Sequence, residues 1–162
     1  MSRFLFMAGC LLFTLRAFAQ QDTAGNAPRY VVLPGVKENF LLSGYSKYNC
    51  WDADSSVIAF AFSHLREGLD SLQKVNEKNF VMAEDFRNMR PFGQYHFQVL
   101  GMQDKNKEHL LLFNATCDLR DVNDITWNTY ILKVYDGGPC YFSVVYNVTA
   151  GRWEMLYFNG TR

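Results

Sequence analysis

The sequence predicts an α+β fold in which one long amphipathic helix packs on a curved antiparallel sheet of four to five strands. Apolar residues recur at helical spacing between residues 55 and 74, and after residue 93 extended segments alternate with short polar turns. Phe, Tyr and Trp make up 16% of the chain, which favours strands because aromatic rings fit a pleated surface. A helix followed by a meander is typical of α+β proteins, and we expect the sheet to wrap around the helix.

The first 19 residues (1–19) have the pattern of a signal peptide. A positive start at Arg3 precedes a nearly unbroken apolar run from Phe4 to Leu15, and Ala17-Phe18-Ala19 has the small residues that signal peptidase recognises. The run is shorter than the roughly 20 residues that span a bilayer, so we expect an exported protein, periplasmic or extracellular, with no membrane span. Met7-Ala8-Gly9-Cys10 resembles a lipobox, but too few apolar residues precede it, and we expect no lipid anchor at Cys10.

After cleavage, a disordered leader is predicted at 20–29 and a single α+β domain at 30–162. Tyr30–Leu33 is expected to be a strand, whereas residues 36–51 show no clean period and are left irregular. Asp52 or Asp54 caps the long helix, and a shorter helix is expected at Met82–Met89. The apolar face of the long helix carries Ile58, Phe62, Leu65, Leu69 and Leu72. The later strands are predicted at 94–102, 108–117, 125–135, 140–148 and 152–158.

The charge balance argues against nucleic acid and anionic membranes as partners. Removal of Arg3 and Arg16 with the signal peptide leaves 14 basic and 16 acidic side chains. A chain that is slightly acidic offers no electrostatic attraction to phosphate-rich surfaces.

The sequence contains no recognisable catalytic, cofactor or metal motif. His64, His96 and His109 lack the spacing of a zinc site, and the acidic loop of Asp118, Asp121 and Asp124 lacks the alternation of a calcium loop. We therefore expect solvated side chains at these positions, no cofactor, no metal and no enzymatic activity.

Three cysteines remain in the mature chain. Cys117 ends one predicted strand and Cys140 begins another, so antiparallel pairing of those strands would bring the two thiols within bridging distance. In an oxidising compartment this predicts a Cys117–Cys140 disulfide. Cys50, next to Trp51, is expected to be a buried free cysteine.

Several strings in the C-terminal half occur in the same order in a group of small exported bacterial proteins of unknown function. They are Gly93-Gln94-Tyr95, Phe113-Asn114-Ala115-Thr116-Cys117, Trp127, Asp136-Gly137-Gly138-Pro139-Cys140-Tyr141-Phe142, Tyr146-Asn147 and Asn159-Gly160. The chain resembles this group over about residues 90–160. The resemblance implies a fold and an exported location but no activity, and no catalytic or binding residue follows from it.

The predicted arrangement also resembles the cystatin-like rolls. The inhibitory hairpin of cystatins carries Gln-x-Val-x-Gly, to which Gln98-Val99-Leu100-Gly101 is similar but one residue shorter. Trp153 lies near a second predicted hairpin tip, without the proline that precedes the cystatin tryptophan. The resemblance implies inhibition of cysteine proteases as a lesser alternative function.

The last two predicted strands are apolar on both faces. One face must meet the helix, and the other carries Tyr141, Val145, Trp153 and Tyr157, which is typical of an interaction face unless residues 30–51 cover it. The sequence therefore predicts an exported, non-enzymatic binding module whose partner is an unknown protein or a second copy of the chain. The alternative is a cone-shaped pocket between helix and sheet that binds or transforms a small molecule.

Overall fold

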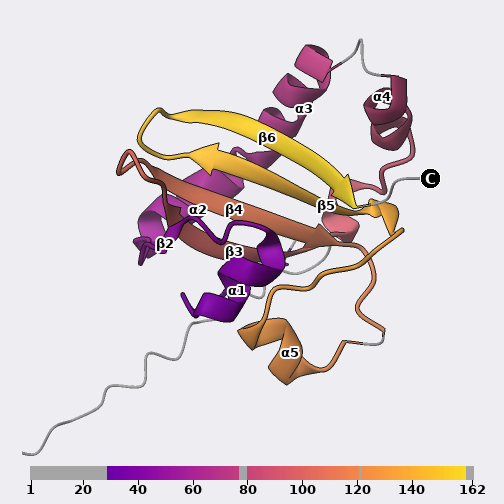
Figure 1. Ribbon diagram of the computed structural model, residues 1–162. Helices are drawn as coiled ribbons and strands as arrows, with labels where there is room; N and C mark the ends of the chain where they lie inside the picture. Colours follow the sequence, from indigo (N-terminus) through magenta and orange to yellow (C-terminus); the bar gives the residue numbers. More distant parts are fainter. Residues whose placement is uncertain (1–28, 77–79, 121, 160–162) are drawn as a thin grey trace, which may run out of the picture.

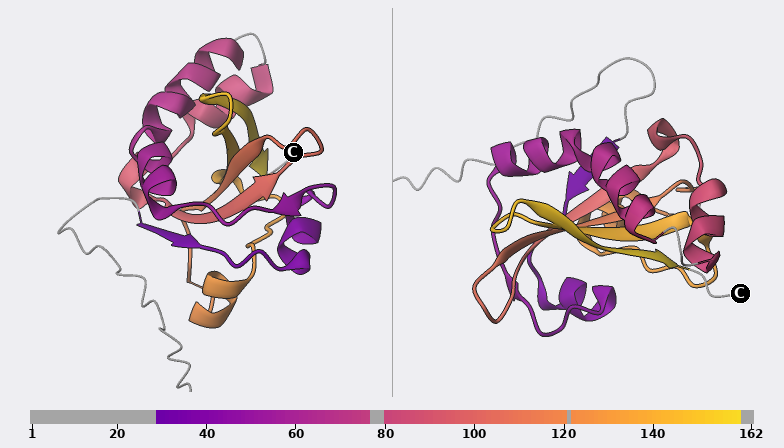
Figure 2. Two further views of the ribbon diagram at one scale, coloured as in Figure 1. Left: turned by 90° about the vertical axis from the view of Figure 1, so that its left-hand side faces the viewer. Right: turned by 90° about the horizontal axis from the view of Figure 1, so that it is seen from above.

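The computed structural model describes residues 29–76, 80–120 and 122–159 (Figure 1). The predicted signal peptide at 1–19 and all but the last residue of the predicted leader at 20–29 lie outside the described residues. The α+β class is confirmed: one mixed β-sheet carries helices on both of its faces (Figures 1 and 2).

The sheet has the order β1-β3-β4-β5-β6, and a very short strand, β2, pairs with β3 beside β1. Its strands are β1 (Arg29–Val32), β2 (Asn49–Cys50), β3 (His96–Gln103), β4 (His109–Thr116), β5 (Gly138–Asn147) and β6 (Arg152–Asn159). β3 to β6 form the antiparallel meander that the sequence predicts. β1 instead runs parallel to β3, so the sheet is mixed and the prediction of a wholly antiparallel sheet is wrong.

The helices form two layers. They are α1 (Lys37–Ser43), α2 (Ser55–Ser63), α3 (Leu65–Asn76), α4 (Phe80–Arg87) and α5 (Asp124–Thr129), with a 3₁₀ turn, η1, at Phe92–Gln94. α2, α3 and α4 lie on one face of the sheet, called here the helix face (Figure 2). α1 and α5 lie on the opposite face, called here the second face (Figure 1).

The single long helix predicted between residues 55 and 74 is replaced by α2 and α3, which are separated at His64. The Ser63 hydroxyl donates to the Phe60 carbonyl at 2.7 Å, and His64 Nδ1 lies 2.9 Å from the same oxygen. These side chains compete for a carbonyl that would otherwise serve the helix alone, and such competition bends or ends helices.

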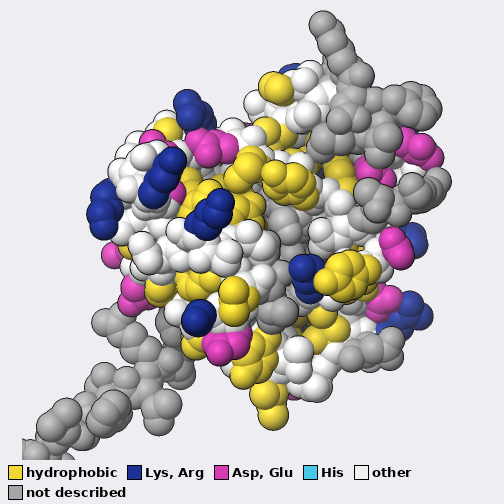
Figure 3. Space-filling view, viewed as in Figure 1, with side chains coloured by type: hydrophobic (Ala, Val, Ile, Leu, Met, Phe, Trp, Pro, Cys, Tyr) yellow, Lys and Arg dark blue, Asp and Glu magenta, His cyan; other side chains and the backbone are white. Residues whose placement is uncertain are grey.

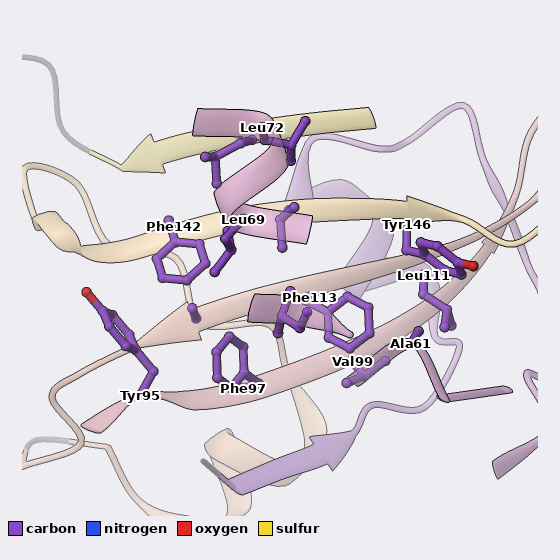
Figure 4. Packing of buried hydrophobic residues seen from close by; sticks show 14 of the residues in the cluster. Ala61, Leu69, Leu72, Tyr95, Phe97, Val99, Leu111, Phe113, Phe142 and Tyr146 are labelled. Carbon is purple, nitrogen blue, oxygen red and sulfur yellow. The ribbon is translucent and has the colours of Figure 1, made fainter. Parts of the chain in front are cut away.

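The helix face buries an apolar core, as the helical periodicity predicts. Ile58, Leu65, Leu69 and Leu72 are buried against the sheet, and Phe62 packs beside them. The strands supply a layer of rings in which the centroids of Phe97 and Phe142 lie 6.1 Å apart (Figure 4). The helices and the strands both contribute buried side chains to this core.

The second face buries a separate, smaller core. Leu33 and Phe40 from the segment around α1 pack on Leu100, Leu112 and Val145 of the sheet. Residues 36–51 therefore form a helix and a short strand where the sequence shows no pattern. The sequence also predicts a strand within 125–135, but none forms there. Asn123 accepts from the Thr126 amide at 2.8 Å and caps α5, which occupies the first part of this range, and the residues after α5 join no strand of the sheet.

Candidate functional site

The predicted disulfide between Cys117 and Cys140 is confirmed. Their Cα atoms lie 5.1 Å apart, and the Cys117 amide donates to the Cys140 carbonyl at 3.0 Å. Cys117 directly follows β4 and Cys140 belongs to β5, its antiparallel neighbour. The bridge therefore closes the segment 118–139, which contains α5.

Three polar side chains that are neighbours in the strand register cross the second face. Gln98 pairs with Asn114, and Asn114 pairs with Ser143. The Asn114 amide donates to Gln98 Oε1 at 3.1 Å, and the Ser143 hydroxyl donates to Asn114 Oδ1 at 2.9 Å. We call these residues the amide ladder.

The amide ladder binds the backbone of α5 and of the segment that follows it. Gln98 Nε2 donates to the Trp127 carbonyl at 2.8 Å and to the Tyr130 carbonyl at 2.7 Å, while Gln98 Oε1 accepts from the Leu132 amide at 2.6 Å. This segment pairs with side chains and not with a neighbouring strand, which is why the strand predicted there does not form.

Asn39 of α1 makes a similar clamp from the other side. It is fully buried, donates to the Pro34 carbonyl at 2.9 Å and to the Thr129 carbonyl at 3.0 Å, and accepts from the Ile131 amide at 2.8 Å. All of these polar groups have hydrogen-bond partners. The segments around α1 and α5, called here the second-face cover, are therefore held in one defined arrangement on the sheet.

The four residues predicted as an interaction face do not form one surface. Val145 is fully buried beneath the second-face cover. A β-bulge between β5 and β6 places Trp153 opposite Tyr146, so Trp153 packs in the helix-face core. A Cβ on Gly68 of α3 would lie 2.3 Å from the indole, which shows how closely α3 approaches Trp153.

Tyr141 and Tyr157 are the two predicted face residues that stay accessible on the second face. Tyr141 is half-buried, because its ring lies against Gly137, where a Cβ would approach to 2.0 Å. Tyr157 is 55% exposed. Of the four residues predicted as an interaction face, Tyr157 is therefore the one whose side chain is mostly exposed to a partner.

Tyr157 belongs to a small aromatic surface that the sequence analysis missed. The rings of Tyr45 and Tyr48, from the connection between α1 and β2, lie 5.2 Å apart, and the Tyr157 hydroxyl lies 3.6 Å from the Met155 sulfur. Burial, followed by the nearby Tyr157 hydroxyl, raises the pKa of Tyr45. We call Tyr45, Tyr48, Met155 and Tyr157 the tyrosine patch. Figure 3 shows hydrophobic side chains on the face of the molecule that carries α1 and β6.

A pair of carboxylates lies near the tyrosine patch but is not arranged for acid–base chemistry. Asn147 is fully buried and donates to Glu108 at 3.0 Å and to Glu154 at 2.8 Å, and Arg152 forms an ion pair with Glu154 at 3.1 Å. The Asn147 amide contacts both carboxyl groups and the Arg152 guanidinium pairs with Glu154, which is typical of a structural network.

β6 is an edge strand of the sheet. It pairs with β5 on one side only, and its outward N–H and C=O groups make no backbone hydrogen bond with any other described segment. The stretch from Met155 to Asn159 carries no charge and no proline, the two devices that most often protect such an edge.

Two open hollows on the surface of the described part of the chain lie outside the space between the helices and the sheet. One, of about 450 Å³, is formed by the loop after α4 and the start of β5, beside Cys140. The other, of about 230 Å³, lies between α1 and β2 and is lined by Lys37, Phe40, Tyr48 and Cys50, among others.

The free cysteine and the three histidines lie in separate places, each with its own neighbours. Cys50 is exposed, which corrects the prediction that it is buried, and partial burial followed by the nearby Asp52 raises the pKa of its thiol. His64 bonds to Phe60, His96 lies beside Trp127, and His109 stacks on Trp51 with centroids 4.3 Å apart. No group of three or more His, Cys, Asp or Glu in the described part of the chain could hold a metal ion.

The string similar to the cystatin motif does not lie at a hairpin tip. Gln98 to Gly101 occupy the middle of β3 and are buried, and Gln98 is committed to the amide ladder. Among the helices that the structure describes, none is both long enough and apolar enough to span a membrane. Comparisons with protein-family models, with curated proteins and with solved structures found no match for this chain.

Proposed function

We propose that this chain is an exported, non-enzymatic binding module that engages its partner through β6 and the tyrosine patch. The observation that carries the proposal is the free outer edge of β6 beside Tyr157, which is 55% exposed. Tyrosine is enriched in protein interfaces because its ring gives apolar contact area and its hydroxyl a polar contact.

The Cys117–Cys140 disulfide supports the proposed export, since such bridges persist in oxidising compartments. The apolar core between the helices and the sheet favours a binding surface over the alternative of an internal pocket. A cystatin-like roll and the inhibition of cysteine proteases stay predictions of the sequence.

The proposal is tested with Tyr157→Ser. The immobilised protein is incubated with an extract of the native cell envelope, and retained proteins are quantified. We expect the variant to lose the specifically retained partner, while its thermal midpoint stays within about 2 °C of the parent because the side chain is exposed.

Tyr130→Ser is the matched control, since Tyr130 is 42% exposed on the second-face cover and lies outside the tyrosine patch. It should retain the partner fully. Equal retention by Tyr157→Ser and the parent protein would overturn the proposed site. Sedimentation of the parent protein alone separates a second copy from a different partner.

A further inference from the structure

The apolar side of α3 continues beyond the sheet that it covers. Leu65, Leu69 and Leu72 are buried, whereas Val75, one further step along the same periodicity, is 77% exposed. Val75 follows Gly68 by seven residues, which is nearly two full turns, so both lie on the same side of α3.

The side of α3 that carries Gly68 and Val75 faces β6. Gly68 lies directly against the indole of Trp153, at the start of that strand. The C-terminal end of α3 extends past β6 in Figure 1 and again in the left view of Figure 2. In the part of the chain that the structure describes, no strand lies beneath Val75, which accounts for its exposure.

We propose, building on the proposed function, that an extended segment of a partner protein adds to β6 as a further strand beneath the end of α3. Backbone groups of the segment pair with the outward N–H and C=O groups of β6, at the usual spacing of about 4.8 Å. Side chains on its helix-face side contact Val75, and those on its other side contact Tyr157. The partner segment is thus apolar at alternate positions on the side that meets Val75.

Because α3 extends past the edge of the sheet, β6 can pair with a partner segment only if no helix covers that segment on the same side. If two copies paired β6 with β6 in one continuous sheet, a two-fold axis would place both α3 helices on the same side of the seam. Each α3 extends past its own edge, so the two would meet over the same strands. A bare extended segment meets no such obstacle.

The first experiment measures amide hydrogen exchange of the disulfide-bonded protein without a partner. Because β6 pairs with β5 on one side only, alternate amides between Met155 and Asn159 should exchange rapidly while those bonded to β5 stay protected. Protection of every β6 amide in the isolated protein contradicts a free edge and overturns the proposal.

The second experiment uses displayed random peptides of about 12 residues as the probe, which is long enough to cover an eight-residue strand. The best binder is synthesised with single N-methyl groups along its backbone. Strand addition predicts loss of affinity at every second position, since alternate amides face β6. It also predicts new exchange protection at the outward β6 amides.

Val75→Lys tests the contact with α3. It should weaken the selected peptide by about tenfold, because an apolar contact is replaced by a charge that prefers water. Val32→Lys is the matched control, since Val32 is 38% exposed on β1 at the opposite edge of the sheet. It should leave peptide affinity unchanged, and thermal midpoints establish that both variants fold.

The outcomes separate this inference from the proposed function. If Tyr157→Ser loses the native partner while the N-methyl scan shows no period of two, the binding module stands and strand addition is wrong. A concentration-dependent dimer that Val75→Lys disrupts identifies a second copy as the occupant and overturns the partner class. A library that yields no binder also overturns strand addition, because backbone pairing tolerates many sequences.

Discussion

The helix face of the sheet is closed by apolar side chains, whereas the second face is closed by a smaller apolar core together with buried amides. On the helix face, Phe97, Phe113 and Phe142 meet α2 and α3 in one continuous core. On the second face, Gln98 and Asn114 hold an irregular segment through hydrogen bonds to its backbone. The stability of the apolar core depends on the volume of its side chains, whereas the buried amides depend on the geometry of their hydrogen bonds.

This difference determines how each face tolerates change. An apolar core adapts to substitutions that keep its volume, with costs that follow the cavity left behind. A buried hydrogen-bond network has no such tolerance, since the loss of one partner leaves its neighbours unsatisfied. Substitutions on the two faces should therefore differ in the interactions that are lost, as well as in the free energy of unfolding that is lost.

The largest effect is expected for Phe113→Ala in the helix-face core. Phe113 is fully buried and its ring lies near those of Phe62 and Trp153. Its truncation should lower the free energy of unfolding by about 4 kcal/mol, measured by urea titration. Leu112→Ala, on the second face of the same strand, should cost about 3 kcal/mol. A loss below about 1 kcal/mol for Phe113→Ala would contradict its place in the core.

The next effect concerns the disulfide, which closes the segment over the second face. The double variant Cys117→Ser and Cys140→Ser should lose about 3 kcal/mol, because the unfolded chain gains freedom when the loop opens. Hydrogen exchange should accelerate at Ile131 and Leu132 more than in β3. Cys50→Ser is the control, since Cys50 is exposed and makes no disulfide, and its stability should match the parent protein.

Gln98→Met tests the amide ladder with a side chain of similar length. It leaves the Leu132 amide and the Trp127 and Tyr130 carbonyls without their partner, and we expect a loss of about 2 kcal/mol. Gln103→Met carries the same change at the end of β3 and should cost much less, because His109 is the one side-chain partner of Gln103 among the described residues. Similar losses for the two variants would show that the ladder does not hold the cover.

The helix-face architecture could be predicted from the sequence because its signals are local. The periodicity of Ile58, Leu65, Leu69 and Leu72 identifies one face of a helical region, and the turns after residue 93 separate the meander strands. The break at His64 was missed because it depends on two side-chain bonds to Phe60, which periodicity does not report.

The second face could not be predicted in the same way. Asn39, Gln98 and Asn114 read as polar residues that belong in turns or on the surface, yet all three are buried. Besides Pro34, the partners of Asn39 lie 90 and 92 residues away, and the carbonyls bound by Gln98 lie about 30 residues away, so no local pattern joins them. The place of Trp153 was missed for a related reason, because one bulge shifts the alternation of β6.

Gly68→Ala tests the close approach of α3 to Trp153. Alanine favours a helix over glycine by about 1 kcal/mol, but its methyl group would overlap the indole. We expect a net loss of about 1 kcal/mol, relieved when Trp153→Leu makes room in the double variant. Ser71→Ala, at an exposed position of α3, should give no loss. A more stable Gly68→Ala protein would contradict the packing.

The smallest expected effect is a dependence of stability on pH that comes from His96, the first residue of β3, which pairs with β1. Burial and the neighbouring Arg29, its register partner on β1, lower the pKa of His96. Because the pKa of His96 is lower in the folded protein, the unfolded chain binds a proton first as the pH falls. The contribution of neutral His96 to the free energy of unfolding is therefore complete above the unfolded pKa of about 6.5 and is lost as the pH falls below it. The thermal midpoint of the parent protein should therefore fall between about pH 7.5 and about pH 5.5 more than that of His96→Gln. Equal slopes for the two proteins would assign the acid sensitivity to other groups.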